Sequence, residues 1–261
     1  MRKLIQCVQL SNEGVTAKDT VKAVKRAGFD GVFVQWYNDA TSEYKTELVN
    51  FCRAQGLEIT FAHLGYERIN ALWLNSSVGD DVIDGFIRDI KTLRDLGVDK
   101  VLVHVSSKEN PPPYCEIGLE RYAKLFEAAE KTGTRVIVEN NKVKGYLEYI
   151  FSNTNYKNVG ICLDVGHCHA HFKDDFNWNV LGGKIEEVHL HDNDGLSDLH
   201  FLPFDGSVPW QFYADRLKEV GYGGAVTLES RYYDKYLCES LEDFYAESYR
   251  RAERVRELFG K

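Results

Sequence analysis

The sequence predicts a single-domain α/β protein of the (β/α)8, or TIM, barrel class, spanning residues 1–261. Three observations support this class: eight short apolar runs alternate with amphipathic runs, several amphipathic runs end at a glycine, and the length suits one barrel of about 250 residues. A doubly wound open sheet is the alternative, but no G-x-G-x-x-G follows the first strand.

Each unit of the repeat reads as a helix, a glycine and a buried strand. Examples are "KAVKRAGFDGVFVQW", "NFCRAQGLEITFAHL" and "KTLRDLGVDKVLVHVS". Glycine just past a helix takes the left-handed conformation without a Cβ penalty, so it marks the helix end. The runs that follow are rich in Val, Ile and Leu and too continuous to have one wet face. That pattern is typical of parallel strands buried on both sides.

The strands are expected, in order, at residues 3–10, 31–36, 57–64, 100–106, 135–140, 159–166, 186–191 and 225–230. Helical patterns lie between them. A last helix is expected at 240–258, with its charges on the solvated face.

Composition and charge restrict the class of protein. The net charge of −8 does not favour nucleic acid as a partner. The six cysteines are scattered without a C-x-x-C pair, which indicates free thiols in a reducing cytoplasm. No apolar stretch reaches 18 residues, and "MRKLIQCVQLSNEG" reads as a first strand rather than a signal peptide. We therefore expect a cytoplasmic protein without a membrane span. The sequence leaves open whether the protein forms a homo-oligomer.

Polar residues follow the apolar runs of six consecutive strands. In a barrel of this class the reactive site lies at the carboxyl ends of the strands. The residues there are His63, His104, Glu139, Asp164 with His167, His189 with His191, and Glu229. Buried charges need partners or a metal, so their convergence on one rim predicts a shared site.

Each of these residues also has a purely structural interpretation. A lone histidine can be a satisfied core residue, Asp164 can cap a helix near Gly166, and Glu139 can pair with a lysine. Independent caps would not converge in six successive units. Imidazole and carboxylate ligands without thiolate suit Mn²⁺, Zn²⁺ or Co²⁺, so we expect one to three divalent ions.

The stretch "VHLHDNDGLSDLH", residues 188–200, places His189 and His191 with the same parity, so both could face inward. The loop that follows, about 193–208, is the longest expected on the rim and carries Asp198 and His200. A long polar loop at this end predicts a lid or a second source of ligands. Asp192 and Asp194 have the turn-forming residue type.

At these residues the sequence resembles the xylose isomerase-like TIM barrel superfamily, which holds sugar isomerases, ketose 3-epimerases and endonuclease IV-type abasic-site nucleases. Glu139, Asp164, His189 and Glu229 match the four metal ligands of the 3-epimerases, and His167 in "DVGH" matches their substrate-contacting histidine. The resemblance covers the third to eighth strands.

The same resemblance extends to the trinuclear zinc site of the endonuclease. It implies one metal on His63, His104 and Glu139, and a second on Glu139 (bridging), Asp164, His189 and Glu229. It implies a third on His167, Asp198 and His200. Short rim loops without an Arg/Lys-rich segment count against carrying the nuclease activity over, and "HDNDGLSDLHFLPFDG" is similar to strings in relatives with presumed sugar substrates.

Three functions follow from these observations. The leading one is a metal-dependent isomerase or epimerase of a sugar or sugar phosphate, in which Glu139 and Glu229 move a proton through a metal-bound enediolate. His167, Trp36 and Arg231 are expected to contact this substrate, Arg231 through a phosphate or a hydroxyl. The alternatives are a zinc-dependent phosphodiesterase acting on abasic DNA, and a non-catalytic barrel that binds a sugar.

Overall fold

A computed structural model of the chain describes residues 2–9, 11–12, 14–37 and 40–260, and these form the predicted barrel. Eight parallel strands follow one another around the ring in the order β10-β1-β4-β5-β6-β7-β8-β9. They are β1 (Leu4–Val8), β4 (Gly31–Trp36), β5 (Glu58–Leu64), β6 (Lys100–His104), β7 (Arg135–Glu139), β8 (Val159–Asp164), β9 (Ile185–His189) and β10 (Val226–Leu228). A parallel bridge between Leu190 and Leu228 closes the ring between β9 and β10.

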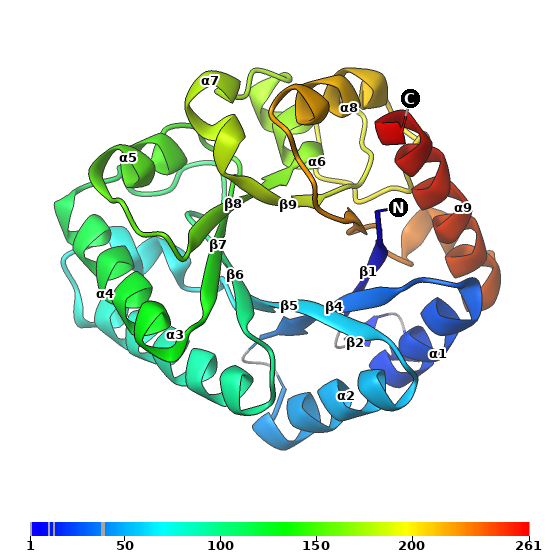
Figure 1. Ribbon diagram of the computed structural model, residues 1–261, viewed down its shortest axis with the longest axis horizontal. Helices are drawn as coiled ribbons and strands as arrows, with labels where there is room; N and C mark the ends of the chain where they lie inside the picture. The colour runs from blue at the N-terminus through cyan, green and yellow to red at the C-terminus, as the bar shows by residue number, and fades with distance from the viewer. Residues whose placement is uncertain (1, 10, 13, 38–39, 261) are drawn as a thin grey trace.

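Helices surround the strands, as the view down the barrel shows (Figure 1). The longer ones are α1 (Ala17–Ala27), α2 (Ser42–Ala54), α3 (Ser77–Asp95), α4 (Glu116–Thr132), α5 (Tyr146–Asn153), α8 (Trp210–Glu219) and α9 (Leu241–Gly260). Gly28 and Gly133 end α1 and α4 in the left-handed conformation, with φ of 107° and 67°, as the sequence predicted.

Short helical segments in the loops were not predicted. They are η1 (Ile69–Trp73), α6 (Val165–His167), the π-helical turn η2 (Cys168–Phe172), α7 (Trp178–Leu181), η3 (Gly182–Lys184) and η4 (Asp234–Tyr236). Most of the predicted strands are one to three residues too long, chiefly because the polar residues after the strands turn toward caps and loops.

Alternation along the strands divides the core into two clusters. The cluster inside the barrel contains Ile5, Cys7, Phe33, Phe61, Leu102, Ile137 and Cys162. The larger cluster, with Val34 and Trp36 among its members, lies between strands and helices. In four strands the site residue stands two positions after an inward-facing member of the inner cluster, for example His63 after Phe61. The apolar cluster inside the barrel thus forms the floor of the site.

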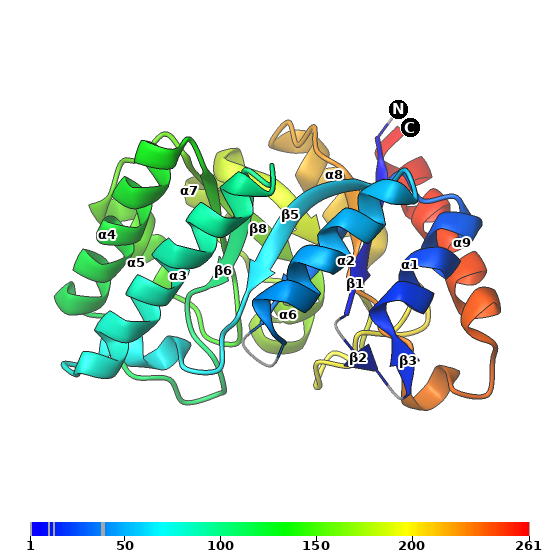
Figure 2. The same ribbon diagram turned by 90° about the horizontal axis from the view of Figure 1, so that it is seen from below.

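The carboxyl ends of the strands form the lower edge of the molecule in Figure 2, and the two termini lie at the opposite end. The short hairpin of β2 (Ser11–Asn12) and β3 (Val15–Thr16) lies at this lower edge. All six cysteines are free, as expected. Within the described residues, no helix combines the length and apolar character that crossing a membrane requires.

Candidate metal centre

The inner group of the site consists of Glu139, Asp164, His189 and Glu229, whose ligand atoms all lie within 4.8 Å of one another. Each side chain is buried and comes from a different strand end. His189 Nδ1 lies 2.9 Å from Glu139 Oε1, 3.4 Å from Glu229 Oε2 and 3.8 Å from Asp164 Oδ2. The His189 ring stacks on Phe33 at 4.9 Å, so the inner core fixes its orientation.

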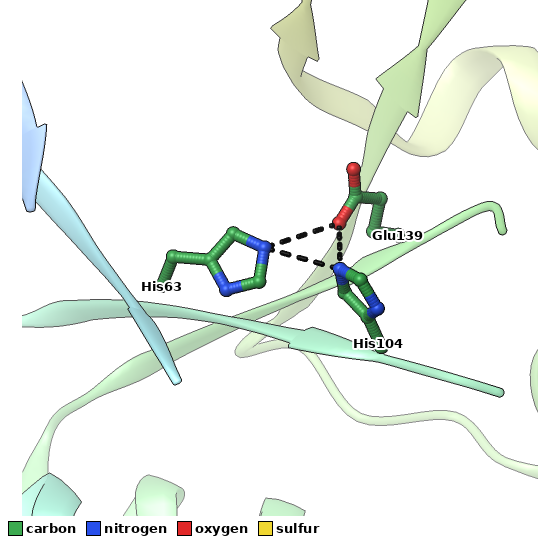
Figure 3. Close-up of side chains that lie close together, drawn as sticks. All are labelled: His63, His104 and Glu139. Atoms are coloured by element: carbon green, nitrogen blue, oxygen red, sulfur yellow. Dashed lines mark hydrogen bonds and ion pairs between the residues drawn. The ribbon is translucent and has the colours of Figure 1, made fainter. Parts of the chain in front are cut away.

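A second group contains His63, His104 and Glu139, which point toward one another from three neighbouring strands (Figure 3). The two Nε2 atoms lie 3.1 Å apart, and both approach Glu139 Oε2, at 3.5 Å from His63 and 2.9 Å from His104. Since Glu139 Oε1 faces His189, its carboxylate joins the two groups. Tyr66 stacks on His104 with ring centres 4.4 Å apart.

The third group combines His167, at the end of α6, with Asp198 and His200 from the loop after β9, which therefore brings further candidate ligands to the site. Asp198 Oδ2 lies 3.3 Å from His167 Nε2, and Asp198 Oδ1 lies 3.2 Å from His200 Nε2. His200 has a positive φ of 45°, which turns its side chain back into the site. The two histidines that the resemblance assigned to a third metal, His167 and His200, thus converge on the carboxylate of Asp198, the third residue of that set.

Backbone carbonyls orient three of these histidines. The Nδ1 atoms of His63, His167 and His200 donate to the carbonyls of Leu64, Asn140 and Glu229, at 2.9, 3.0 and 2.9 Å. Nδ1–H donation leaves Nε2 with its lone pair toward the cluster in the neutral ring. This second contact is the usual companion of a metal-binding histidine.

His191 is a member of the cluster to which the sequence analysis gave no role. Its ring is fully buried, with Nε2 3.1 Å from Asp164 Oδ1 and 3.7 Å from Asp198 Oδ1. It stacks on His200 at 4.0 Å. His191 also forms two possible ligand groups, one with Asp164 and His167 and one with Asp198 and His200. The inward direction that its parity with His189 predicted is confirmed by its approach to Asp164.

Two asparagines that the sequence analysis did not select tie the strand ends together. Asn140 Oδ1 accepts from the Asp164 amide at 2.8 Å, and its Nδ2 donates to the Asp164 carbonyl at 2.9 Å. Asn141 Oδ1 accepts from the amides of Val105 and Ser106 at 2.9 and 3.2 Å. The polar run after Glu139 therefore holds the ends of β6, β7 and β8 in register.

The buried acceptors of the cluster fit a cation. Asp164 Oδ1 caps α6 by accepting from the His167 amide at 2.7 Å, so the capping interpretation explains one oxygen. Asp164 Oδ2 and Asp198 Oδ1 are buried and accept no hydrogen bond from any residue that the structure describes. Buried carboxylate oxygens without donors are costly unless a cation supplies the missing charge. Their nitrogen and oxygen neighbours suit a borderline divalent ion.

The protein surrounds its buried carboxylates with imidazoles, and this shifts several pKa values. Burial raises the pKa of Glu139, but His189 and His104 outweigh it and hold that pKa well below its usual range. Burial also raises the pKa of Glu229, but His189 and His200 outweigh it and lower that pKa to about 2. Burial lowers the pKa of His167, but Asp164 and Asp198 raise it well above the usual value. Protons on such imidazoles are what a bound metal would displace.

A cavity of about 300 Å³ opens above the cluster. His63, His104, His167, Asp198, His200 and Glu229 line its floor, and Arg231 lines it from the loop after β10. Tyr37 and Tyr66 add aromatic walls. A cavity of this size and mixed character is typical of small-molecule sites.

Trp36 does not line this cavity, so its expected contact with substrate is wrong. Its side chain is 2% exposed, belongs to the outer core, and donates from Nε1 to Asp89 Oδ1 at 3.0 Å. The cause is strand alternation: Phe33 faces inward on β4, so position 36 faces the helices, whereas Tyr37, one residue on, lines the cavity.

The loop after β9 is shaped by Asp192. Its Oδ1 accepts from the amides of Asn193 and Val208, and its Oδ2 from the Phe204 amide and Trp210 Nε1, all at 2.8–2.9 Å. Asp194 accepts from two amides in the following turn. Both aspartates thus have the turn chemistry that their residue type predicted, in contrast to Asp164 and Asp198.

The comparisons with known proteins now decide the family. The model of the xylose isomerase-like TIM barrel family matches residues 21–255. The chain belongs to this family. Among its relatives are an uncharacterized protein of Methanocaldococcus jannaschii, 30% identical over 42% of this chain, and the fructoselysine 3-epimerase of Escherichia coli O157:H7, 27% identical over 49%. The chain spans about half the length of these curated relatives, 41% and 51% respectively.

Solved structures show how widely this family fold recurs. The D-psicose 3-epimerase of Clostridium cellulolyticum H10, solved with D-tagatose, superposes with a TM-score of 0.75, at 14% identity over 98% of this chain and 99% of that one. The 3-keto-D-glucoside 4-epimerase of E. coli gives a TM-score of 0.72, at 16% identity over 98% and 100%. At these identities the likeness establishes the shared fold.

Proposed function

We propose that this xylose isomerase-like barrel is a metal-dependent isomerase or epimerase of a sugar or sugar phosphate. The observation that carries the proposal is the inner group, in which Glu139, Asp164, His189 and Glu229 converge within 4.8 Å. The group lies below a cavity large enough for a sugar. The fructoselysine 3-epimerase, the D-psicose 3-epimerase and the 3-keto-D-glucoside 4-epimerase are named for sugars or sugar derivatives, which supports the same substrate class here.

The four inner residues would hold the first metal, and a divalent ion bound there supplies Lewis acidity that makes the C–H bond beside a sugar carbonyl more acidic. Glu139 and Glu229 are the two carboxylates nearest to His189 Nδ1, at 2.9 and 3.4 Å. One takes the proton from carbon, the electron pair passes to the carbonyl oxygen, and an enediolate results. The other returns a proton to the opposite face or to the adjacent carbon.

Side chains above the cluster would orient the substrate. His167 presents Nε2 toward the cavity and is held from behind by the Asn140 carbonyl, so it can bind a hydroxyl or serve the third metal. Tyr37 and Tyr66 can pack against the apolar face of a sugar ring.

The first test is the metal content per chain of protein purified without added metal or chelator. We expect one to three equivalents of Mn, Co or Zn, bound to protein that epimerises or isomerises members of a panel of free and phosphorylated ketoses. Protein without bound metal that accepts no metal on titration would contradict the proposal.

The second test is Glu229→Gln. Glutamine keeps the shape but cannot accept a proton as a base, so turnover should fall at least ~10²-fold, the range for general acid–base groups. Sugar binding, measured by calorimetry, should change little once metal content is matched. Glu219→Gln is the control, because that carboxylate lies on the exposed face of α8 and pairs with Arg216. Near wild-type turnover in Glu229→Gln would remove this residue from the mechanism.

Phosphodiester hydrolysis at abasic DNA is the second candidate, and one observation favours it. The second and third groups form around Glu139 and Asp198, so all nine residues matched to a trinuclear site come together. Three zinc ions per chain and cleavage of an abasic duplex, with strongly salt-dependent binding, would favour this candidate.

A further inference from the structure

Three cations line the mouth of the cavity without a carboxylate partner. Lys108 follows β6, Lys142 follows β7 and Arg231 follows β10, so they approach the cavity from three loops. Among the residues that the structure describes, none accepts a hydrogen bond or ion pair from any of these three side chains. The mouth therefore holds unused positive charge above an acidic, imidazole-rich floor.

Arg231 is the most constrained of the three. Its backbone amide donates to the His200 carbonyl at 3.0 Å, which fixes the chain beside the third group. Its Nε is buried and has no acceptor in the described structure. This Nε–H has lost its hydration without gaining an acceptor, so an acceptor supplied by a ligand would restore the lost hydrogen bond.

A shortage of acidic residues does not explain these unpaired cations. The chain has 40 Asp and Glu against 32 Lys and Arg. Lys144, two residues after Lys142, pairs with Asp175, and Arg121 pairs with Asp80. At the mouth itself Glu67 is the acidic residue outside the metal-binding groups, and it is exposed.

We propose that the cavity takes a sugar bearing a phosphate monoester, whose phosphate is bound by Arg231 together with Lys142 and Lys108. The inference rests on the proposed function and names its substrate class. A phosphate carries nearly two negative charges and three strong acceptor oxygens, which a hydroxyl cannot match. The planar guanidinium can hold two oxygens at once, and the lysines add point charges.

The test compares D-fructose 6-phosphate with D-fructose as probes, using protein loaded with metal to a constant stoichiometry and isothermal calorimetry as the readout. We expect the wild type to bind the phosphate ester at least tenfold more tightly. Arg231→Gln should lose at least tenfold in affinity for the ester and less than twofold for the free sugar. Metal ions that attract phosphate are common to both proteins, so this difference isolates the guanidinium.

Arg231→Lys should recover part of the loss, and Lys142→Gln should lose three- to tenfold for the ester alone. Arg216→Gln is the matched control, because that arginine lies on the exposed face of α8 and pairs with Glu219. Equal binding of both probes by the wild type would overturn the proposal. An equal loss for both probes in Arg231→Gln would overturn it as well.

Further probes separate this inference from the proposed function. Tighter Arg231-dependent binding of 5-keto-D-gluconate than of the ester would overturn the phosphate in favour of a carboxylate. Tighter binding of an abasic duplex would overturn the sugar phosphate. Arg231-dependent binding of the ester without turnover of any ketose would support the inference while the proposed function fails. Turnover of free ketoses, together with binding of the ester that Arg231→Gln leaves unchanged, would do the reverse.

Discussion

At the scale of single residues, the closest packing in the site lies between Gly166 and His191. A Cβ atom on Gly166 would lie 2.0 Å from His191 Cε1, far inside contact distance. His191 is fully buried and stacked on His200, so its ring has no free space into which it can move. The glycine of "DVGH" is therefore required by the position of a neighbouring imidazole.

We expect Gly166→Ala to destabilise the protein by about 1–3 kcal/mol, the usual cost of overpacking a filled site. Because His191 must shift, binding of a metal at the third group should weaken while the inner group keeps its ion. Thermal unfolding and metal content per chain measure the two effects. Gly183→Ala is the control, since a Cβ there has open space. Equal behaviour of the two variants would show that His191 moves without cost.

At the scale of elements, the loop between β9 and α8 depends on Asp192. Its two oxygens accept four hydrogen bonds from residues spread over the loop and the start of α8. The same loop delivers Asp198 and His200 to the cavity. A carboxylate outside the candidate metal groups thus sets the position of two candidate ligands.

Asp192→Asn should cost about 2–4 kcal/mol of unfolding free energy, because an amide NH₂ cannot accept the bonds that one carboxylate oxygen now accepts. Chemical denaturation measures this cost, and metal titration should show weaker binding at the third group. Asp194→Asn, at an exposed turn of the same loop, should change stability by less than about 1 kcal/mol. Similar costs for both variants would contradict the role given to Asp192.

The sequence analysis predicted the elements that carry the site better than the loops that complete it. Strand-end residues such as Glu139 and His189 follow from the apolar runs, since a run of this kind and the position of its end are local properties. Asp164 shows the limit: one oxygen is the helix cap of the structural interpretation and the other is available to a metal. The capping interpretation is confirmed for one oxygen, and the metal interpretation stays a prediction for the other.

Loop geometry and side-chain direction were the parts that sequence reasoning missed. Trp36 was chosen because it stands beside the rim, but strand alternation sends it to the outer core. His191 lies beyond the end of β9 and reaches Asp164 only because the chain continues in the same direction. Hydrogen bonds such as that of Asn140 to the next strand are nonlocal, and no periodicity encodes them.

At the scale of the whole molecule, the barrel concentrates buried carboxylates and imidazoles at one end. In the metal-free protein, burial lowers the pKa of His167, but Asp164 and Asp198 outweigh burial and raise that pKa. Burial also lowers the pKa of His189, and Cys162 and Glu229 outweigh it there. These imidazoles keep protons that the unfolded chain loses above pH ~6.5. Their stabilising contribution is full below that pH and is lost as the pH rises through the higher folded values.

We therefore expect the melting temperature of metal-stripped protein to fall by several degrees between pH 7 and 8.5. His104 and His200, whose pKa values are lowered chiefly by burial, are neutral in both states in this range and add no slope. Metal binding needs deprotonated ligands, so metal-loaded protein should not show this fall, and the gap between the two forms should widen. Parallel scanning calorimetry of both forms measures the gap. A constant gap would show that protons and metal do not compete for these residues.

The seam between β9 and β10 lies beside the candidate metal centre. The last strand, β10, has only three residues. It joins the segment after β9 through the bridge of Leu190 with Leu228. In this bridge the Leu190 amide donates to the Thr227 carbonyl, and the Glu229 amide donates to the Leu190 carbonyl. His189 stands on one side of this seam and Glu229 on the other. An ion bound by both would cross-link β9 and β10 where the barrel has its fewest interstrand hydrogen bonds. Removing the ion would therefore allow these two strands to separate more often.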